Sequence, residues 1–384
     1  MEKLIVQPLK ESSISTVIVI DALDECEDEE PASAILSVLG RLASGIPQVK
    51  FFLTGRPEPQ ISKGFRLPLV AKITDIFLLH EVKLSQVDSD IQLFFTSSFL
   101  ELVSYTDGLD DWPTRGQLGH LCKRAAGLFV YAAATVKFIS DNKKNPKERL
   151  DVLLQSKKIG AREGKSLDSL YTSILQEAFG NDLEDDPKIH SVLGAVILAI
   201  NPLSPSTIAL LLCFHVDDVF PFLSSVNSLL ILQGVNHPVR PFHKSFPDFI
   251  TDPTRCTNQR FHISPPDHHL ELLVACLNLM NQRLEKNMCQ LPDAVANSDV
   301  GDLKERIEKH IDPALQYACL SWHIHLVDAD TKPAHAPTIT PTLHKFLETK
   351  FLFWLEVLSI LGTARNAVDA LQVTQDWLEV CPLL

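Results

Sequence analysis

The first 80 residues alternate between short apolar runs and one amphipathic segment. Residues 16–20 (TVIVI) and 49–54 (VKFFLT) are the continuous apolar runs of strands buried on both faces of a parallel sheet. Between them, segment 31–45 starts with proline, ends with glycine and places Ile35, Leu36, Leu39, Leu42 and Ala43 at helical spacing. Residues 75–82 predict a third strand. This order predicts an α/β unit with a parallel sheet over residues 1–85.

After residue 85 the pattern becomes helical. Apolar faces at helical spacing predict an all-helical subdomain over 86–155, followed by a polar, Lys-rich connection. Residues 166–255 predict several helices, one of them with Ser204 as N-cap and Pro205 at its first position. Two apolar runs around the turn-rich link 233–238 then predict a hairpin, which gives a winged-helix pattern.

Residues 256–384 predict a helical tail, so that the protein is mostly α overall. The expected helices cover 267–284, 313–326, 342–361 and 364–380, with a loop over 331–341. We find no internal repeat of 20 to 50 residues.

Composition and charge narrow the functional classes. The 384 residues carry 35 Lys and Arg against 48 Asp and Glu, a formal charge of −13, and the winged-helix region has more acidic than basic residues. The negative electrostatic field of such a chain disfavours nucleic acid as a partner. The start has no apolar leader, no run approaches a membrane span, and the cysteines lack C-x-x-C spacing. We therefore expect a cytoplasmic, soluble protein.

The first candidate site is acidic. Asp21, Asp24 and Glu25 follow the strand 16–20 directly, and ligands of doubly wound sheets bind at the carboxyl ends of the strands. Asp21 is the candidate to hold Mg²⁺ through water, and Asp24 and Glu25 are candidate catalytic carboxylates that polarise an attacking water. The alternative is an acidic surface loop, because seven of residues 21–30 are Asp or Glu.

The second candidate is Arg56, which follows the strand 49–54 in the sequence Thr-Gly-Arg-Pro. An arginine at the tip of the adjacent strand can contact a terminal phosphate with two parallel hydrogen bonds. The alternative is an ordinary surface arginine. Its place one strand after the acidic pair favours a nucleotide sensor.

Together these motifs resemble a known family. IVIDALDECED followed by FFLTGRPEP is similar to the Walker B and sensor-1 segments of NACHT-type STAND signalling NTPases, especially the fungal group resembling vegetative-incompatibility proteins. Residues 121–132 resemble the helical-domain motif of that family, and residues 239–249 resemble its winged-helix segment. The resemblance implies that His243 contacts the β-phosphate of ADP in the resting state. The alternative is a structural cap or a hydrogen-bonded core histidine.

The sequence departs from the family in one respect. The phosphate-binding loop G-x-x-x-x-G-K-S/T is expected well before Walker B, yet only 20 residues precede Asp21. Residues 160–166 (GAREGKS) are one residue short of that motif and follow no strand. Without the amide cradle, the carboxylates and Arg56 form half a site, and we expect ATP or ADP with Mg²⁺ to bind weakly.

We therefore expect a truncated regulatory or interaction module, of the innate-immunity or incompatibility type, without autonomous ATP hydrolysis. Its partners would be other NACHT-type chains or signalling proteins. One alternative is residual nucleotide binding with a cradle supplied by another chain. Another is a fragment of a full ATP- or GTP-binding NTPase whose P-loop lies upstream in an incomplete gene model. The histidine pairs His268/His269 and His323/His325 are interpreted as surface residues rather than metal ligands.

Overall fold

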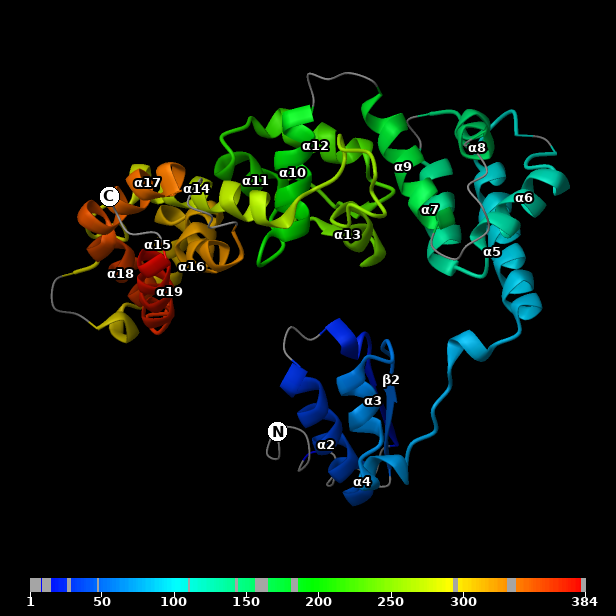
Figure 1. Ribbon diagram of the computed structural model, residues 1–384, viewed down its shortest axis with the longest axis horizontal. Helices are drawn as coiled ribbons and strands as arrows, with labels where there is room; N and C mark the ends of the chain where they lie inside the picture. The colour runs from blue at the N-terminus through cyan, green and yellow to red at the C-terminus, as the bar shows by residue number, and fades with distance from the viewer. Residues whose placement is uncertain are drawn as a thin grey trace. The chain divides into compact units, whose positions relative to one another are not determined.

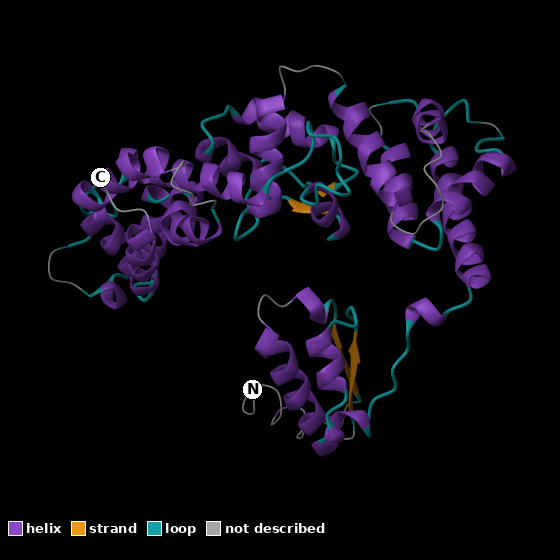
Figure 2. Ribbon diagram, in the orientation of Figure 1, coloured by secondary structure: helices purple, strands orange, loops and turns teal. Residues whose placement is uncertain are grey.

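The computed structural model describes residues 8, 15–25, 29–46, 48–109, 111–141, 144–155, 165–180, 186–292, 296–329 and 336–380. Contacts divide the chain into two compact units, Met1–Lys83 and Leu84–Leu384, and each is described by itself. Most of the described residues are helical, and strands are few and short (Figure 2). The expectation of a mostly α protein is confirmed, whereas the four-part domain division stays a prediction.

The first unit contains a strand, a helix and a second strand in the predicted order (Figure 1). β1 pairs in parallel with β2, with Thr16 opposite Val49 and Ile20 opposite Leu53. The described elements of this unit are β1 (Thr16–Ile20), η2 (Leu23–Glu25), α2 (Glu29–Gly45), β2 (Val49–Leu53), α3 (Pro59–Phe65), α4 (Pro68–Ala71) and η3 (Leu79–Glu81).

The core of the first unit lies between one sheet face and helices α2 and α3. Leu23, Leu36 and Ile61 are its buried centre, each at most 4% exposed. Gly64 permits the close approach of α3 to α2, because a Cβ atom there would lie 2.4 Å from Leu36 Cδ1. The sheet face that packs against the helices therefore carries Ile18, Ile20, Phe51 and Leu53.

Two expectations for this unit are wrong. The strands are not buried on both faces, because Val17, Val19 and Phe52 are 60–63% exposed and no described element of the unit covers them. Residues 75–82 form no strand. They run without regular structure into the short helix η3, and Ile76 and Phe77 are 63% and 76% exposed. A strand requires a neighbour for its backbone hydrogen bonds, and this run has none within the described part of the unit.

The second unit is built from helices with one small hairpin. Its described elements are α5 (Leu84–Ser104), α6 (Arg115–Ala125), α7 (Phe129–Ile139), α8 (Pro146–Gln155), α9 (Lys165–Phe179), α10 (Asp186–Leu198), α11 (Pro205–Leu211), α12 (Val216–Ser225), β3 (Leu230–Ile231), β4 (Arg240–Pro241), α13 (Ser245–Ile250), α14 (Pro265–Arg283), η5 (Asn297–Asp299), α15 (Leu303–His310), α16 (Pro313–Asp328), α17 (Ala336–Thr349), α18 (Phe351–Ile360) and α19 (Asn366–Val380).

Local sequence signals explain several of these boundaries. Ser204 caps α11 by accepting a hydrogen bond from the Thr207 N–H, and Pro205 occupies the first turn, as predicted. Strands β3 and β4 pair antiparallel in a hairpin whose strands are shorter than expected. The predicted loop 331–341 is wrong from residue 336 onward, because α17 contains Pro341. Buried Ile339, Leu343 and Phe346 form one apolar face that continues past this proline.

One continuous core runs through the second unit, in which α14 packs against α10, α16 and α17. Near its C-terminal end, Trp322, Phe346 and Trp354 form an aromatic cluster with ring centroids 5.3–5.8 Å apart, all in edge-to-face geometry. The Trp354 Nε1–H donates to the Cys319 carbonyl at 2.9 Å. No helix in the described residues combines the length and the apolar character needed to cross a membrane.

Candidate functional site

The candidate site lies where β1 and β2 end at the same edge of the sheet. Because Ile20 pairs with Leu53, the next residues, Asp21 and Thr54, leave this edge side by side. The Thr54 hydroxyl donates to Asp21 Oδ1 and accepts the Ala22 N–H at 2.9 Å. The Leu23 N–H then donates to the Thr54 carbonyl at 2.9 Å. These bonds hold the two loops together.

Asp24 and Arg56 form the second link between the loops. The Arg56 backbone N–H donates to Asp24 Oδ1 at 3.0 Å, and Arg56 Nε lies 3.6 Å from Asp24 Oδ2. The Asp24 side chain is 5% exposed and that of Arg56 is 49% exposed. Gly55 leaves room for this contact, because a Cβ atom there would lie 3.3 Å from Asp24 Oδ1, closer than an ordinary van der Waals contact. A nearly buried carboxylate is therefore paired with a half-exposed guanidinium.

The backbone at Ala22 directs these side chains. Ala22 has a φ of +52°, a left-handed conformation that is uncommon outside glycine. It lies between the exposed Asp21 and Leu23, which enters the core at 3% exposure. The structure thus brings Asp21, Asp24 and Arg56 together, and Glu25 follows on η2. The side chain of Glu25 lies outside the described residues.

Thr54→Val tests the link at the strand ends. The substitution keeps the shape of the side chain but leaves the Ala22 N–H without its acceptor, so we expect about 1 kcal/mol of local destabilisation. Amide hydrogen exchange at Ala22 should accelerate by about fivefold. Thr96→Val is the control, because Thr96 belongs to the other unit and its hydroxyl donates to the Gln92 carbonyl of its own helix. Unchanged exchange at Ala22 would contradict the role of Thr54.

His243 lies in the second unit, between β4 and α13, and its side chain is exposed. Its Nδ1 accepts the Ser245 N–H at 3.1 Å and lies 2.7 Å from Ser245 Oγ. This is the local hydrogen bonding that a structural cap requires.

The paired histidines are buried, so their interpretation as surface residues is wrong. His268 lies within hydrogen-bond distance of the Ser264 and His190 carbonyls, at 3.1 and 2.9 Å. His325 is fully buried and joins His269 to Tyr317. The hydrogen bonds of His268, His269 and His325 join backbone carbonyls, a phenol and one another. Within the described residues, the buried His323 Nδ1 has no hydrogen-bond partner. In the described parts of the chain, no group of three or more His, Cys, Asp or Glu side chains is arranged to hold a metal ion.

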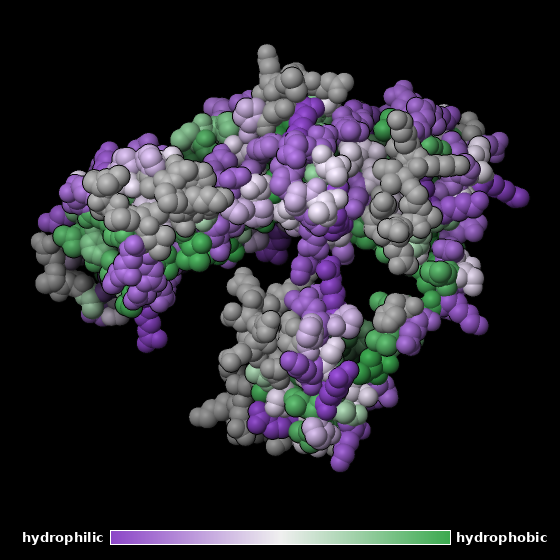
Figure 3. Space-filling model, in the orientation of Figure 1, coloured by the Kyte–Doolittle hydropathy of each residue, from purple (hydrophilic) through white to green (hydrophobic). Residues whose placement is uncertain are grey.

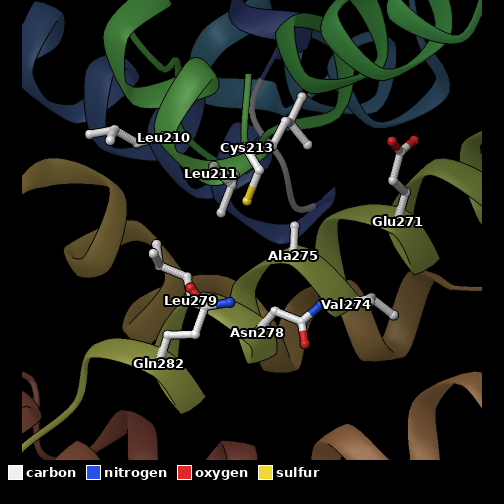
Figure 4. A pocket seen from close by; sticks show the side chains of 10 residues that line it. Leu210, Leu211, Cys213, Glu271, Val274, Ala275, Asn278, Leu279 and Gln282 are labelled. Atoms are coloured by element: carbon white, nitrogen blue, oxygen red, sulfur yellow. The ribbon is translucent and has the colours of Figure 1, made fainter. Parts of the chain in front are cut away.

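A shallow cavity of about 220 Å³ lies in the second unit, between the end of α11 and helix α14 (Figure 4). Leu210 and Cys213 line one side, and Glu271, Asn278 and Gln282 line the other. None of the predicted site residues borders it. Figure 3 shows that apolar and polar residues are interspersed over the visible face of both units.

Sequence reasoning missed three residues of these sites. Thr54 could have been predicted, since a hydroxyl that directly follows a strand can reach the acid at the end of the neighbouring strand. The sequence indicates the role of Gly55 less strongly. Nothing in the sequence indicates Tyr171, which contacts Ser245 beside His243, because 74 residues separate it from its partner.

Comparison with known proteins gives two matches. The family described as "Nephrocystin 3, N-terminal" matches residues 1–56, the segment with the acidic motif and Arg56. The chain is also 24% identical, over 386 aligned residues, to the vegetative incompatibility protein HET-E-1 of Podospora anserina. That alignment covers 94% of this chain and 27% of the length of HET-E-1, so the chain spans about a quarter of this relative. No solved structure matches.

These matches agree with the motifs at the strand ends. The chain is NACHT-like, and the predicted resemblance to the NACHT-type proteins of fungi is confirmed. Within that class, its similarity to a vegetative incompatibility protein extends over nearly the whole chain.

Proposed function

We propose that the chain is a regulatory and interaction module of a NACHT-like fungal signalling protein, of the incompatibility type. The observation that supports this most is the similarity to HET-E-1 over 94% of the chain, combined with the meeting of Asp21, Asp24 and Arg56 at one sheet edge. The partners we propose are other NACHT-type chains or signalling proteins of the cytoplasm. Residues 166–255 would act as a winged helix.

The site residues suit a nucleotide that is held weakly. Asp21 is exposed and offers the oxygen ligands that Mg²⁺ prefers, here through water. Arg56 offers N–H donors to a phosphate, and the Asp24 carboxylate holds the Nε end of the Arg56 guanidinium. His243 stays the residue that the family resemblance implies for contact with a β-phosphate. Asp24 and Glu25 would be the vestiges of the catalytic pair.

Autonomous ATP hydrolysis is not part of this proposal. Phosphoryl transfer depends on positioning by a glycine-rich backbone cradle and its lysine, and these 384 residues contain no G-x-x-x-x-G-K-S/T string. In addition, the Asp24 carboxylate is nearly buried and engaged by Arg56, so it is poorly placed to activate a water.

Equilibrium binding of ADP and ATP with Mg²⁺ to the full chain tests the proposal. We expect a Kd weaker than about 1 mM, which corresponds to less than about 4 kcal/mol of binding free energy. Arg56→Ala should weaken this binding further, whereas Arg66→Ala, at an exposed arginine of the same unit, should not. Micromolar binding, or ATP turnover that Asp24→Asn abolishes, would contradict the proposal.

A second candidate function is full nucleotide binding, with the cradle supplied by residues outside this sequence or by another chain. The coverage of only 27% of HET-E-1 favours this candidate. An in-frame G-x-x-x-x-G-K-S/T codon run in the genomic sequence before Met1 would support it. If a longer product carrying that run binds ADP micromolarly, the second candidate replaces the first.

A further inference from the structure

One backbone carbonyl of the β3–β4 hairpin points away from the hairpin itself (the short strands of the second unit in Figure 2). The Phe242 N–H donates to the Leu229 carbonyl at 2.8 Å, so these two residues form a hydrogen-bonded pair across the hairpin. The next pair is Leu230 with Pro241, and its backbone groups point outward, because bonded and non-bonded pairs alternate in an antiparallel ladder. Leu230 is fully buried, and a buried carbonyl requires a donor.

Lys137 of helix α7 supplies that donor. Its ammonium donates to the Leu230 carbonyl, and the same Nζ lies 4.8 Å from the centroid of the Phe242 ring. A cation over an aromatic face is attracted by the negative charge of that face. One side chain of α7 thus contacts β3 and the residue that follows β4, although 93 positions separate Lys137 from Leu230.

In the described part of the chain, the Lys137 ammonium has neutral partners only, and no carboxylate pairs with it. Its half-buried position lowers the pKa of the ammonium, because the carbonyl and the ring replace only part of the lost hydration. The long stem of a lysine lets its charged end return to water by rotation about the side-chain bonds. The contact can therefore open and close without any change in the core.

The helix and the hairpin that this contact joins each have other packing partners. Helix α7 packs against α5, α6, α8 and α9. The hairpin is attached on its other side, where the Val239 N–H donates to the Leu203 carbonyl at 2.9 Å and β4 packs against α10. When the Lys137 contact opens, both elements therefore keep their folds, and only the attachment of the hairpin to α7 is lost.

We propose that Lys137 is a reversible strap between helix α7 and the β3–β4 hairpin. With its ammonium on the Leu230 carbonyl, the hairpin is held against α7. With the ammonium in water, the hairpin and the residues that follow it, Phe242 among them, are free to move relative to α7. The strap needs no bound nucleotide, so this inference goes beyond the proposed function and does not depend on it.

Amide hydrogen exchange of the full chain, resolved by residue, tests the strap. The Phe242 N–H is the reporter, because a pair of two-residue strands is too short to protect its own amides. Lys137→Met keeps an unbranched side chain without the ammonium and should accelerate exchange at Phe242 by about tenfold, the lower end of what a hydrogen bond from a charged group contributes. Lys147→Met, at an exposed lysine of α8, should leave this rate unchanged. An unchanged rate with Lys137→Met would overturn the proposal.

Two comparisons separate the strap from a general loss of stability. The Trp354 N–H, which donates to the Lys350 carbonyl, should exchange at the same rate in every variant. Equal acceleration at Trp354 and Phe242 would contradict the strap, because Lys137→Met would then destabilise the whole unit. Lys137→Arg keeps a cation that can donate to a carbonyl and lie over a ring, so it should preserve the slow exchange at Phe242. If Lys137→Arg accelerates exchange as much as Lys137→Met does, the positive charge does not hold the hairpin and the proposal fails.

Discussion

Replacing Trp354 by alanine is expected to lower the free energy of unfolding of the Leu84–Leu384 unit by about 3 to 5 kcal/mol. Trp354 is fully buried and packs against Trp322 and Phe346, and its indole N–H bonds the Cys319 carbonyl. The substitution leaves a large cavity in the core and removes the hydrogen bond that the indole N–H gives to the Cys319 carbonyl. Urea unfolding followed by far-UV circular dichroism measures the loss as a lower midpoint at similar slope.

Leu352→Ala is the matched control for this change. Leu352 lies two residues earlier on the same helix and is 73% exposed, so its truncation should change the free energy of unfolding by less than about 0.5 kcal/mol. Equal effects of the two substitutions would mean that the aromatic cluster does not form as described.

Acidification is expected to destabilise the same unit through its buried histidines. The Ile200 N–H donates to the Tyr317 oxygen at 3.2 Å, and this phenol lies 2.6 Å from His325 Nε2. His325 Nδ1 in turn lies 2.8 Å from His269 Nδ1. Every bond in this row is satisfied when both imidazoles are neutral. Burial lowers the pKa of His325 to about 3 and also lowers the pKa of His269.

The sign of the effect follows from these lowered pKa values. In the unfolded chain both histidines take up a proton as the pH falls below about 6.5, whereas in the folded chain they stay neutral to lower pH. The unfolded state therefore binds more protons in this range, and the contribution to stability is present above pH 6.5 and lost below it. Each histidine contributes a slope of up to about 1.4 kcal/mol per pH unit.

Urea midpoints measured between pH 7.5 and 4.5 check this prediction. His325→Leu should lower stability at pH 7.5 by about 2 kcal/mol, because it removes the His325 nitrogens that bond the Tyr317 hydroxyl and His269 Nδ1. It should also flatten the pH dependence of the free energy of unfolding. His344→Leu, at an exposed histidine beside Glu348, should leave the slope unchanged. If stability depends on pH equally steeply in the protein with His325→Leu, the pH dependence does not arise from His325.

Much of the local structure could be predicted because it depends on short-range chemistry. The strands at 16–20 and 49–53, the helix between them and the cap at Ser204 follow from apolar runs, helical spacing and N-terminal residue preferences. Their parallel pairing follows from the helical crossover. The convergence of Asp21 and Arg56 at one edge followed from the same topology.

The predictions are wrong where the structure depends on packing between residues that are far apart in the sequence. The run 75–82 has strand composition, but whether it pairs depends on an edge that composition does not reveal. The histidine pairs are buried because α14 and α16 pack on each other, which no spacing within either helix signals. The ion pair of Asp24 with Arg56 and the bond of Tyr171 to Ser245 join residues 32 and 74 positions apart. Such partners become visible only in three dimensions.

Both faces of β1 carry apolar side chains, and this affects how β1 is aligned with β2. A shift of one residue along the neighbouring strand would turn Val17 and Val19 inward in place of Ile18 and Ile20, with little change in the apolar area buried. Hydrophobicity therefore does not select the alignment of β1 with β2. The alignment is selected by the hydrogen bonds from Thr54 to Asp21 and from Arg56 to Asp24, because these bonds form in one alignment only. The polar residues at the strand ends thus fix how the two strands are aligned, and substitutions there risk a mixture of misaligned sheets.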